Sequence, residues 1–215
     1  MTCDKQAMLL YAVTDRAWTG KQTLYEQVEA ALKGGATCVQ LREKELCHAA
    51  FLEEALALKK LCQSYHVPFI INDDVEIAIA CGADGVHIGQ GDMNVSKARG
   101  LIGGDMILGV SAHTAREAQR AVEDGADYLG VGAVFATTTK EDASVLSYQT
   151  VCEICSTVSI PVVAIGGIHK KNLTGLAGSG VDGIAVVSAL FSAHDIEAEC
   201  RELRALSQRM VTACT

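Results

Sequence analysis

The sequence contains little proline and few aromatic residues. Proline accounts for 2 of its 215 residues, and Phe, Trp and Tyr together for 5%. A fold dense in tight turns would use more proline, so the composition favours helix-rich α/β packing over an all-β fold. Because 49% of the residues are hydrophobic, aliphatic side chains can fill a large core. We expect one domain over residues 1–215, with flexible ends at 1–7 and 211–215.

The chain also lacks excess positive charge and any long hydrophobic run. Its formal net charge is −8, which gives no electrostatic case for a nucleic-acid partner, because such binding depends on clustered Lys and Arg. No run approaches the roughly 20 residues that span a bilayer, so no membrane partner is expected. The N-terminus has no basic segment followed by an apolar one, which predicts a cytoplasmic protein. The oligomeric state stays open, with a homo-oligomer as one alternative.

The nine cysteines are odd in number and mostly fall in apolar surroundings. Buried free cysteine behaves as a small hydrophobic residue, which favours a packing role. Cys152 and Cys155 form a C-x-x-C pair, but no second pair or nearby histidine accompanies it, and it lies within a predicted helix. We therefore interpret the cysteines as core residues, with metal or redox chemistry as the weaker alternative.

A repeated unit runs along the whole chain. Eight times, a short apolar run ends in polar residues and is followed by an amphipathic stretch. The runs are Met8–Asp15, Cys38–Lys44, Phe69–Asp73, Gly85–Gln90, Ile107–His113, Tyr128–Thr139, Pro161–Gly167 and Gly183–Ser188. Several are apolar without alternation, as is typical of parallel strands covered on both faces.

The segments between the runs favour helices. Residues 49–65 and 114–123 show helical spacing, and glycines at 34–35, 82, 125 and 180 are placed to end helices before the next run. Eight strand-and-helix units predict a single (β/α)8 barrel, the TIM barrel. All strands of this fold open onto one face, which holds the active site. The polar residues that end the runs should therefore share one pocket.

Two of these strand ends favour phosphate binding. Gly166 and Gly167 follow the seventh run, and Val187 with Ser188 ends the eighth. Phosphate often binds at the corresponding loops of TIM barrels, and glycine lets backbone N–H groups approach an anion closely. The alternative is that the two glycines only form a tight turn.

Acidic residues end the third and fourth runs. Asp73 follows Asn72, and Asp92 follows Gln90. Neighbouring strands lie about 4.8 Å apart, so both carboxylates could bind one cation. Two carboxylates with substrate phosphates and water are how Mg²⁺ is usually held. Each acid alone could instead cap a helix, as Asp74 could.

A basic segment ends the second run. Gln40, Arg42 and Lys44 alternate along a predicted strand, so their side chains share one side. If Arg42 and Lys44 line the mouth of the barrel, their positive charges need an anionic partner. That anion could be a substrate, or a structural carboxylate such as Glu43 or Glu45.

The fifth and sixth runs end in further polar groups. Thr137–Lys140 offers hydroxyls and an ammonium, which suit phosphate oxygens, although a solvated loop would look the same. Ser111 is a candidate hydrogen-bond donor to a substrate. His113 and His87 are interpreted as structural histidines.

The sequence offers no evident protein nucleophile. It contains no G-x-S-x-G motif and no HExxH motif, and its two candidate lysines, Lys44 and Lys140, lie at loop starts and not in the interior of a strand. What remains is a set of anion-binding groups with a candidate metal site. That inventory favours phosphate or pyrophosphate transfer, in which positioning and charge stabilisation supply most of the catalysis.

These motifs, in this order, resemble those of the thiamine-phosphate synthase (thiamine-phosphate pyrophosphorylase) family over nearly the whole chain. The segments that carry the resemblance are Leu10–Asp15, Val39–Lys44, Ile71–Asp73, Gly85–Gln90 with Asp92, Gly109–Ser111, Thr137–Lys140, Val163–Ile168 and Val187–Ala189. The resemblance implies a TIM-barrel transferase of thiamine biosynthesis. Its reaction joins 4-amino-2-methyl-5-hydroxymethylpyrimidine diphosphate to hydroxyethylthiazole phosphate, or to the carboxylate form of that thiazole. Pyrophosphate leaves first, and the thiazole nitrogen then attacks.

The resemblance also implies roles for individual residues. The Mg²⁺ ligands would be Asp73 and Asp92. The groups around the pyrimidine diphosphate would be Gln40, Arg42, Lys44, Asn72, Ser111 and Lys140. Those around the thiazole phosphate would be Thr137, Thr139, Gly167, Val187 and Ser188. The catalytic candidates among them are Arg42, Ser111 and Lys140.

One loop departs from the family pattern. The family usually reads Gly-Pro-(Ile/Val)-Phe-Pro-Thr, whereas residues 132–137 here read Gly-Ala-Val-Phe-Ala-Thr. Ala133 and Ala136 thus replace two rigid prolines, which predicts a less preorganised loop. A thiazole tautomerase and a non-catalytic regulatory relative of the same barrel are the alternatives. The complete set of diphosphate and metal residues favours the synthase.

Overall fold

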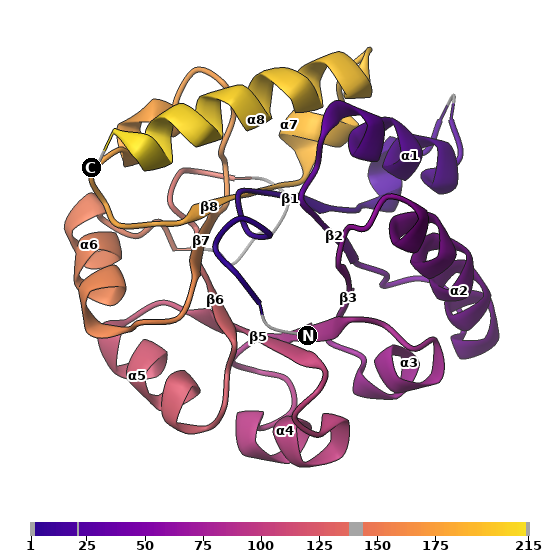
Figure 1. The fold of residues 1–215 in the computed structure, drawn as a ribbon, viewed down its shortest axis with the longest axis horizontal. Coiled ribbons are helices and arrows are strands. Elements are labelled where there is room, and N and C mark those ends of the chain that lie inside the picture. The colour runs from indigo at the N-terminus through magenta and orange to yellow at the C-terminus, as the bar shows by residue number, and fades with distance from the viewer. Residues whose placement is uncertain (1–2, 21, 138–143, 214–215) are drawn as a thin grey trace.

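Eight parallel strands form a closed barrel in the order β1 to β8, surrounded by helices (Figure 1). This computed structural model describes residues 3–20, 22–137 and 144–213, and it confirms the predicted (β/α)8 fold. The strands are β1 Leu10–Val13, β2 Cys38–Leu41, β3 Phe69–Asn72, β4 Gly85–Ile88, β5 Ile107–Ala112, β6 Tyr128–Gly132, β7 Val162–Ile165 and β8 Gly183–Val186. Tyr11 of β1 pairs with Cys38 on one side and Ala185 on the other, which closes the barrel.

Each strand is shorter than the apolar run that predicted it. The polar residues at the run ends have mostly left the sheet, because they form the loops that lead into the helices. The largest difference is at β6, where the run extends to Thr139 but the strand ends at Gly132. Residues 138–143, including Thr139 and Lys140, lie outside the described residues.

The helices follow the strands in the expected order. They are α1 Leu24–Gly34, α2 His48–Ser64, α3 Val75–Ala80, α4 Val95–Ile102, α5 Ala115–Glu123, α6 Tyr148–Thr157, α7 Ser188–Phe191 and α8 Ile196–Thr212, with 3-10 turns η1 Arg16–Trp18 and η2 Leu173–Leu176. The predicted helices over 49–65 and 114–123 correspond to α2 and α5 within one residue at each end.

One unit differs from the prediction. An amphipathic stretch was expected after every strand, but β7 is followed only by the short turn η2. Glycines at 175, 178 and 180 make a longer helix costly there, because glycine loses much conformational freedom in a helix. At the C-terminus, α8 extends to Thr212, so part of the expected flexible end at 211–215 is helical. Residues 1–2 and 214–215 of the expected flexible ends lie outside the described residues.

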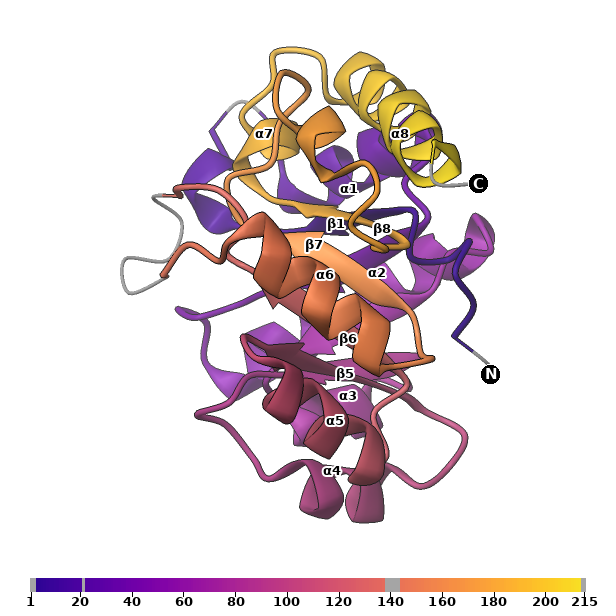
Figure 2. The same ribbon diagram turned by 90° about the vertical axis from the view of Figure 1, so that its left-hand side faces the viewer.

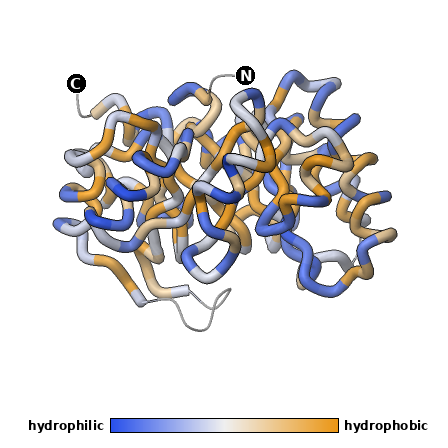
Figure 3. Tube along the Cα trace, turned by 90° about the horizontal axis from the view of Figure 1, so that it is seen from below, coloured by the Kyte–Doolittle hydropathy of each residue, from blue (hydrophilic) through white to orange (hydrophobic). Residues whose placement is uncertain are grey.

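The core has an outer and an inner part. The outer part packs the helices against the barrel with mostly aliphatic side chains, and Figure 3 shows hydrophobic and hydrophilic stretches alternating along the chain. The inner part fills the barrel and is formed by Met8, Tyr11, Val13, Cys38, Ile70, Ile107, Tyr128, Val163 and Ala185. Four cysteines are buried, as the packing interpretation predicts: Cys38, Cys62, Cys81 and Cys200.

The two ends of the barrel differ. The segment before β1 crosses one end (Figure 1), and the side view shows the C-terminal end of α8 at that same end (Figure 2). The loops that follow the strands lie at the opposite end. Within residues 3–20, 22–137 and 144–213, no helix is both long and apolar enough to cross a membrane.

Candidate functional site

The described candidate residues lie at the C-terminal ends of the strands, on one face of the barrel. Three of them lie within strands: Gln40 in β2, Asn72 in β3 and Ser111 in β5. The others follow strands: Arg42 and Lys44 after β2, Asp73 after β3, Asp92 after β4, Thr137 after β6, Gly167 after β7, and Val187 with Ser188 after β8. Parallel strands that close into a barrel bring these ends together, as the sequence predicted.

The two acids at β3 and β4 lie next to each other. Burial and the neighbouring Asp92 raise the pKa of Asp73, while Lys44 opposes this shift. Asp73 has a left-handed backbone with a φ of 64°, and its N–H donates to the carbonyl of His87 at 2.7 Å. Lys44 Nζ lies 2.5 Å from Asp73 Oδ2. The carboxylates therefore form a pair that a cation would stabilise.

Neither acid of this pair caps a helix. The N-cap of α3 is Asp74, whose side chain accepts from the Ile77 N–H at 2.9 Å. The N-cap of α4 is Asn94. Asp92 instead accepts from the Gly89 N–H at 2.7 Å. The capping alternative thus holds for Asp74 and is wrong for the candidate pair.

A cation between these acids would need further oxygen ligands. Across the described part of the chain, no group of three or more His, Cys, Asp and Glu side chains could hold a metal. Two hard carboxylates do fit Mg²⁺, which usually takes only one or two protein carboxylates and completes its shell with phosphate oxygens and water. The ammonium of Lys44 already supplies positive charge to Asp73.

The partner of Arg42 is a residue that the sequence reasoning did not single out. Arg42 Nη1 lies 2.9 Å from Asp15 Oδ2, and the Arg42 N–H donates to Thr14 Oγ1 at 3.0 Å. Glu43 and Glu45 were the structural partners considered for the basic segment, but they do not make this contact. Asp15 ends the first run, so its place at a strand end was the signal that could have identified it.

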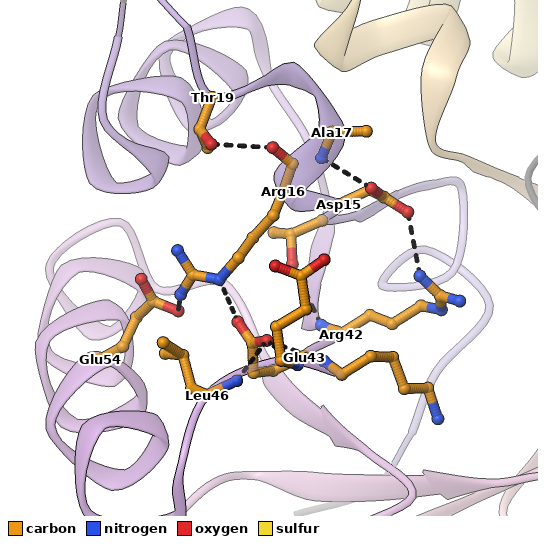
Figure 4. A network of polar contacts seen from close by, with 11 residues as sticks. Asp15, Arg16, Ala17, Thr19, Arg42, Glu43, Leu46 and Glu54 are labelled. Carbon is orange, nitrogen blue, oxygen red and sulfur yellow. Dashed lines mark hydrogen bonds and ion pairs between the residues drawn. The ribbon is translucent and has the colours of Figure 1, made fainter.

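Glu43 turns inward and organises the loop between β2 and α2 (Figure 4). Its Oε1 accepts from the N–H groups of Lys44 at 2.8 Å, Glu45 at 2.6 Å and Leu46 at 3.1 Å. Its Oε2 accepts from Nε of Arg16. Burial alone would raise the pKa of Glu43, but these backbone donors and Arg16 hold it below its usual value. The charge of Glu43 is thus used to shape the loop that carries Lys44.

The two histidines make contacts that agree with structural roles. His87 uses both ring nitrogens, Nδ1 with Tyr128 Oη and Nε2 with Ser111 Oγ, each at 3.0 Å. Burial lowers the pKa of His87 to about 4, so the ring is neutral at physiological pH. His113 Nδ1 lies 3.3 Å from Glu117 Oε2. Among these residues, only Ser111 remains a candidate for substrate contact.

The ends of β7 and β8 form the second part of the site. Gly167 has a φ of 64°, and a Cβ there would lie 2.3 Å from the carbonyl oxygen of Ala136. Glycine is therefore required for both conformation and close approach. Val187 is the N-cap of the short helix α7, and Ser188 is its first residue. A short helix after β8 is a common component of phosphate sites in TIM barrels.

The loop without prolines is anchored where it leaves the barrel. The N–H groups of Val134 and Phe135 donate to the carbonyls of Ile165 and Gly166, each at 3.0 Å. These contacts hold the segment from Ala133 to Ala136 against β7. The loss of preorganisation is expected over Thr137–Lys140, and residues 138–140 of that segment lie outside the described range.

The C-x-x-C pair lies in the middle of α6, as predicted, and both its thiols are half-buried. Burial raises the pKa of Cys155 to about 12, so this thiol is protonated and a poor metal ligand. We expect Cys152→Ser with Cys155→Ser to keep its turnover within about twofold, because serine is nearly isosteric and neither residue lies at the strand ends. Steady-state kinetics and metal analysis test this. Loss of a bound metal would contradict the packing interpretation.

Comparison with known proteins identifies the family that the strand-end motifs resemble. Residues 10–190 match the family model described as thiamine monophosphate synthase. Thiamine-phosphate synthase of Clostridium acetobutylicum is 51% identical over 192 residues, which cover 89% of this chain and 91% of that protein. The enzyme of that name from Chloroflexus aurantiacus is 52% identical over 198 residues, covering 92% and 91% respectively.

A solved structure gives the same result in three dimensions. Thiamine phosphate pyrophosphorylase from Pyrococcus furiosus superposes with a TM-score of 0.89 at 39% identity, covering 96% of this chain and 98% of that one. The resemblance inferred from the strand-end motifs is thus confirmed over nearly the full length. The chain belongs to the thiamine monophosphate synthase family, a family of transferases.

Proposed function

We propose that this chain joins 4-amino-2-methyl-5-hydroxymethylpyrimidine diphosphate to hydroxyethylthiazole phosphate, or to its carboxylate, with Mg²⁺ and release of pyrophosphate. The proposal is supported by two different regions on one face of the barrel, each with groups that suit an anion or its metal complex. The first combines the Asp73–Asp92 pair with Lys44 and Arg42. The second is formed by Gly167 and the start of α7, and it would offer backbone N–H groups. Such asymmetry suits a metal-bound diphosphate and a monophosphate.

The residues of the first region would act on the leaving group. Loss of pyrophosphate places negative charge on the departing oxygen, and Arg42, Lys44 and Lys140 would neutralise it. Mg²⁺ bound to Asp73 and Asp92 would supply further positive charge to the diphosphate. Because Lys44 already contacts Asp73, diphosphate binding would place its ammonium between two anions. This reaction needs no protein nucleophile, which agrees with the lack of an evident nucleophile among the candidate residues at the strand ends.

The second region would hold the acceptor. Thr137, Thr139, Gly167, Val187 and Ser188 would bind the thiazole phosphate, with Gln40, Asn72 and Ser111 around the pyrimidine. Binding both substrates on one face brings the thiazole nitrogen to the methylene that loses pyrophosphate. The expected partners are these small molecules. Cytoplasmic location stays a prediction, and the oligomeric state stays open, with a homo-oligomer as one alternative.

The direct test is product formation from both substrates, with and without Mg²⁺. We expect Mg²⁺-dependent thiamine phosphate together with an equal amount of pyrophosphate. A folded protein that binds the thiazole but makes no product would contradict the proposal and favour the tautomerase or regulatory alternative. Conversion of one thiazole isomer to another by the same sample would distinguish these two.

We expect Lys140→Ala to lower kcat/KM for the pyrimidine diphosphate by more than about tenfold, the scale of one lost charged contact of roughly 1.4 kcal/mol or more. The KM for the thiazole phosphate should change little. Lys60→Ala, at an exposed position of α2, is the matched control and should behave as the wild type. A change confined to the thiazole KM would assign Lys140 to the other substrate.

A further inference from the structure

Five polar side chains form one hydrogen-bonded chain across the inside of the barrel. Gln40 Nε2 lies 2.9 Å from Tyr11 Oη, which lies 2.8 Å from Tyr128 Oη. His87 continues the chain, with Nδ1 3.0 Å from Tyr128 Oη and Nε2 3.0 Å from Ser111 Oγ. The chain connects β2 to β5 through β1, β6 and β4. Its two ends are residues that the proposed function places at the pyrimidine.

The barrel interior accommodates this chain. Tyr11 and Tyr128 are 2% and 0% exposed and lie among mainly aliphatic neighbours. A Cβ at Gly109 would lie 2.1 Å from Cζ of Tyr128, and one at Gly130 would lie 3.0 Å from Cε1 of His87. Glycines on β5 and β6 therefore leave room for the two rings. Because buried polar groups need hydrogen-bond partners, the five side chains satisfy one another.

The amide end indicates the direction of the chain. Gln40 donates from Nε2, so Tyr11 accepts and can donate to Tyr128, and Tyr128 can donate to Nδ1 of His87. The proton of the neutral ring then lies on Nε2 and is donated to Ser111. In the reverse direction, Tyr128 would donate to Tyr11, which already accepts from Gln40. The hydroxyl hydrogen of Tyr11 would then have only the Cys38 thiol as an acceptor, and a thiol accepts hydrogen bonds weakly.

We propose that this series of hydrogen bonds makes Ser111 a hydrogen-bond donor toward the substrate, with Tyr11, Tyr128 and His87 as positioning residues. Ser111 accepts from His87, so its own O–H can serve a ring nitrogen of a bound heterocycle. Gln40 donates inward, which leaves its carbonyl oxygen for an N–H of the same ligand. The choice of an aminopyrimidine, which has both groups, rests on the proposed function. The direction of the hydrogen bonds does not depend on the proposed function.

The protonated nitrogen of His87 tests the direction without any substrate. In ¹⁵N-labelled protein at pH 7, long-range ¹H–¹⁵N spectra distinguish the Nε2–H tautomer from the Nδ1–H tautomer, and a His87→Gln sample assigns the signals. We expect Nε2–H. A ring protonated on Nδ1 would overturn the proposal, because Ser111 would then donate to His87 and not to a ligand.

The variant Tyr128→Phe tests the positioning role. It removes one hydroxyl from the middle of the chain, so we expect the KM for the pyrimidine diphosphate to rise about tenfold, the scale of one lost hydrogen bond. The KM for the thiazole phosphate should stay within about twofold, and the His87 signals should shift toward a mixture of tautomers. Tyr148→Phe removes a hydroxyl that donates to the Ala177 carbonyl at 2.8 Å, and it should leave both KM values unchanged.

Two results with Tyr128→Phe would overturn the proposal. One is an equal loss for both substrates, which would indicate a general effect on packing. The other is an unchanged His87 tautomer with unchanged kinetics. If the variant does not fold, the tautomer of the wild-type protein still decides the direction. Because that measurement needs no activity, it also separates a failure of this inference from a failure of the proposed function.

Discussion

Replacing Asp92 with asparagine should lower turnover by about 10²–10³-fold, the range observed when one electrostatic contact to a transition state is removed. The reason is its place beside Asp73, where the two carboxylates would share a cation that holds the diphosphate. Asparagine keeps an oxygen that can accept from the Gly89 N–H, so the local loop contact should survive. Steady-state kinetics over a range of Mg²⁺ concentrations provides the measurement. The Mg²⁺ concentration for half-maximal rate should rise.

Unlike turnover, the stability of the metal-free protein should not fall when Asp92 is replaced with asparagine. Burial and Asp92 raise the pKa of Asp73, which means that the ionised pair opposes folding at neutral pH. Removing one charge should therefore leave the free energy of unfolding unchanged or increase it. The pKa of Asp73 should fall, because its negative neighbour is gone. A loss of activity that simply follows a loss of stability would contradict the metal assignment.

The adjacent residue provides a matched control. Asp74 caps α3 through a hydrogen bond to the Ile77 N–H, and asparagine caps helices about as well as aspartate. Asp74→Asn should therefore retain near-normal turnover, whereas Asp73→Asn should lose activity as Asp92→Asn does. Equal effects at positions 73 and 74 would show that general charge, and not the pair, matters.

The second large effect is expected for Glu43→Gln. Glutamine keeps one acceptor but places an N–H₂ group against either the backbone donors of the loop or Arg16, so several charge-assisted hydrogen bonds are lost. We expect the free energy of unfolding to fall by roughly 2–3 kcal/mol. Because the loop presents Lys44, kcat/KM for the pyrimidine diphosphate should fall by about tenfold or more. Chemical denaturation and kinetics with each substrate measure the two effects.

A control and a pH profile sharpen this prediction. Glu54→Gln removes the other carboxylate of Arg16, whose Nη2 lies 2.5 Å from Glu54 Oε2, but leaves the loop contacts of Glu43 intact. This variant should cost less than about 1 kcal/mol. The lowered pKa of Glu43 stabilises the wild type above the usual carboxyl pKa, and this contribution is lost as pH falls through the folded-state value. Glu43→Gln should lack that acid-dependent component. Equal effects of Glu43→Gln and Glu54→Gln would contradict the loop-organising role.

Much of the fold was predictable because it follows from local patterns. Apolar runs without alternation, helical spacing between them and glycines at helix ends each depend on a few neighbouring residues. The boundaries of α2 and α5 were correct within one residue for that reason. The prediction was wrong after β7, where the glycines around η2 prevent a full helix. The run at β6 was too long, because apolar residues that pack as a loop look like a strand in sequence.

The candidate site was partly predictable for a different reason. Once eight parallel strands are assigned, every strand must end on the same face, so polar residues that follow strands are brought together by topology alone. This places Asp73 beside Asp92 without any knowledge of side-chain conformation. It also identifies the glycines after β7 and the start of α7 as a separate region.

The sequence by itself determined the barrel and the face on which its chemistry lies, whereas only the tertiary structure decided which polar groups pair. Arg42 pairs with Asp15 and Lys44 with Asp73, although Glu43 is nearer to both along the chain. Tyr11 and Tyr128 meet inside the barrel at a separation of 117 residues. Hydrogen bonds act over about 3 Å and depend on direction. The closure of the barrel sets these distances, so they cannot be predicted from the periodicity of the sequence.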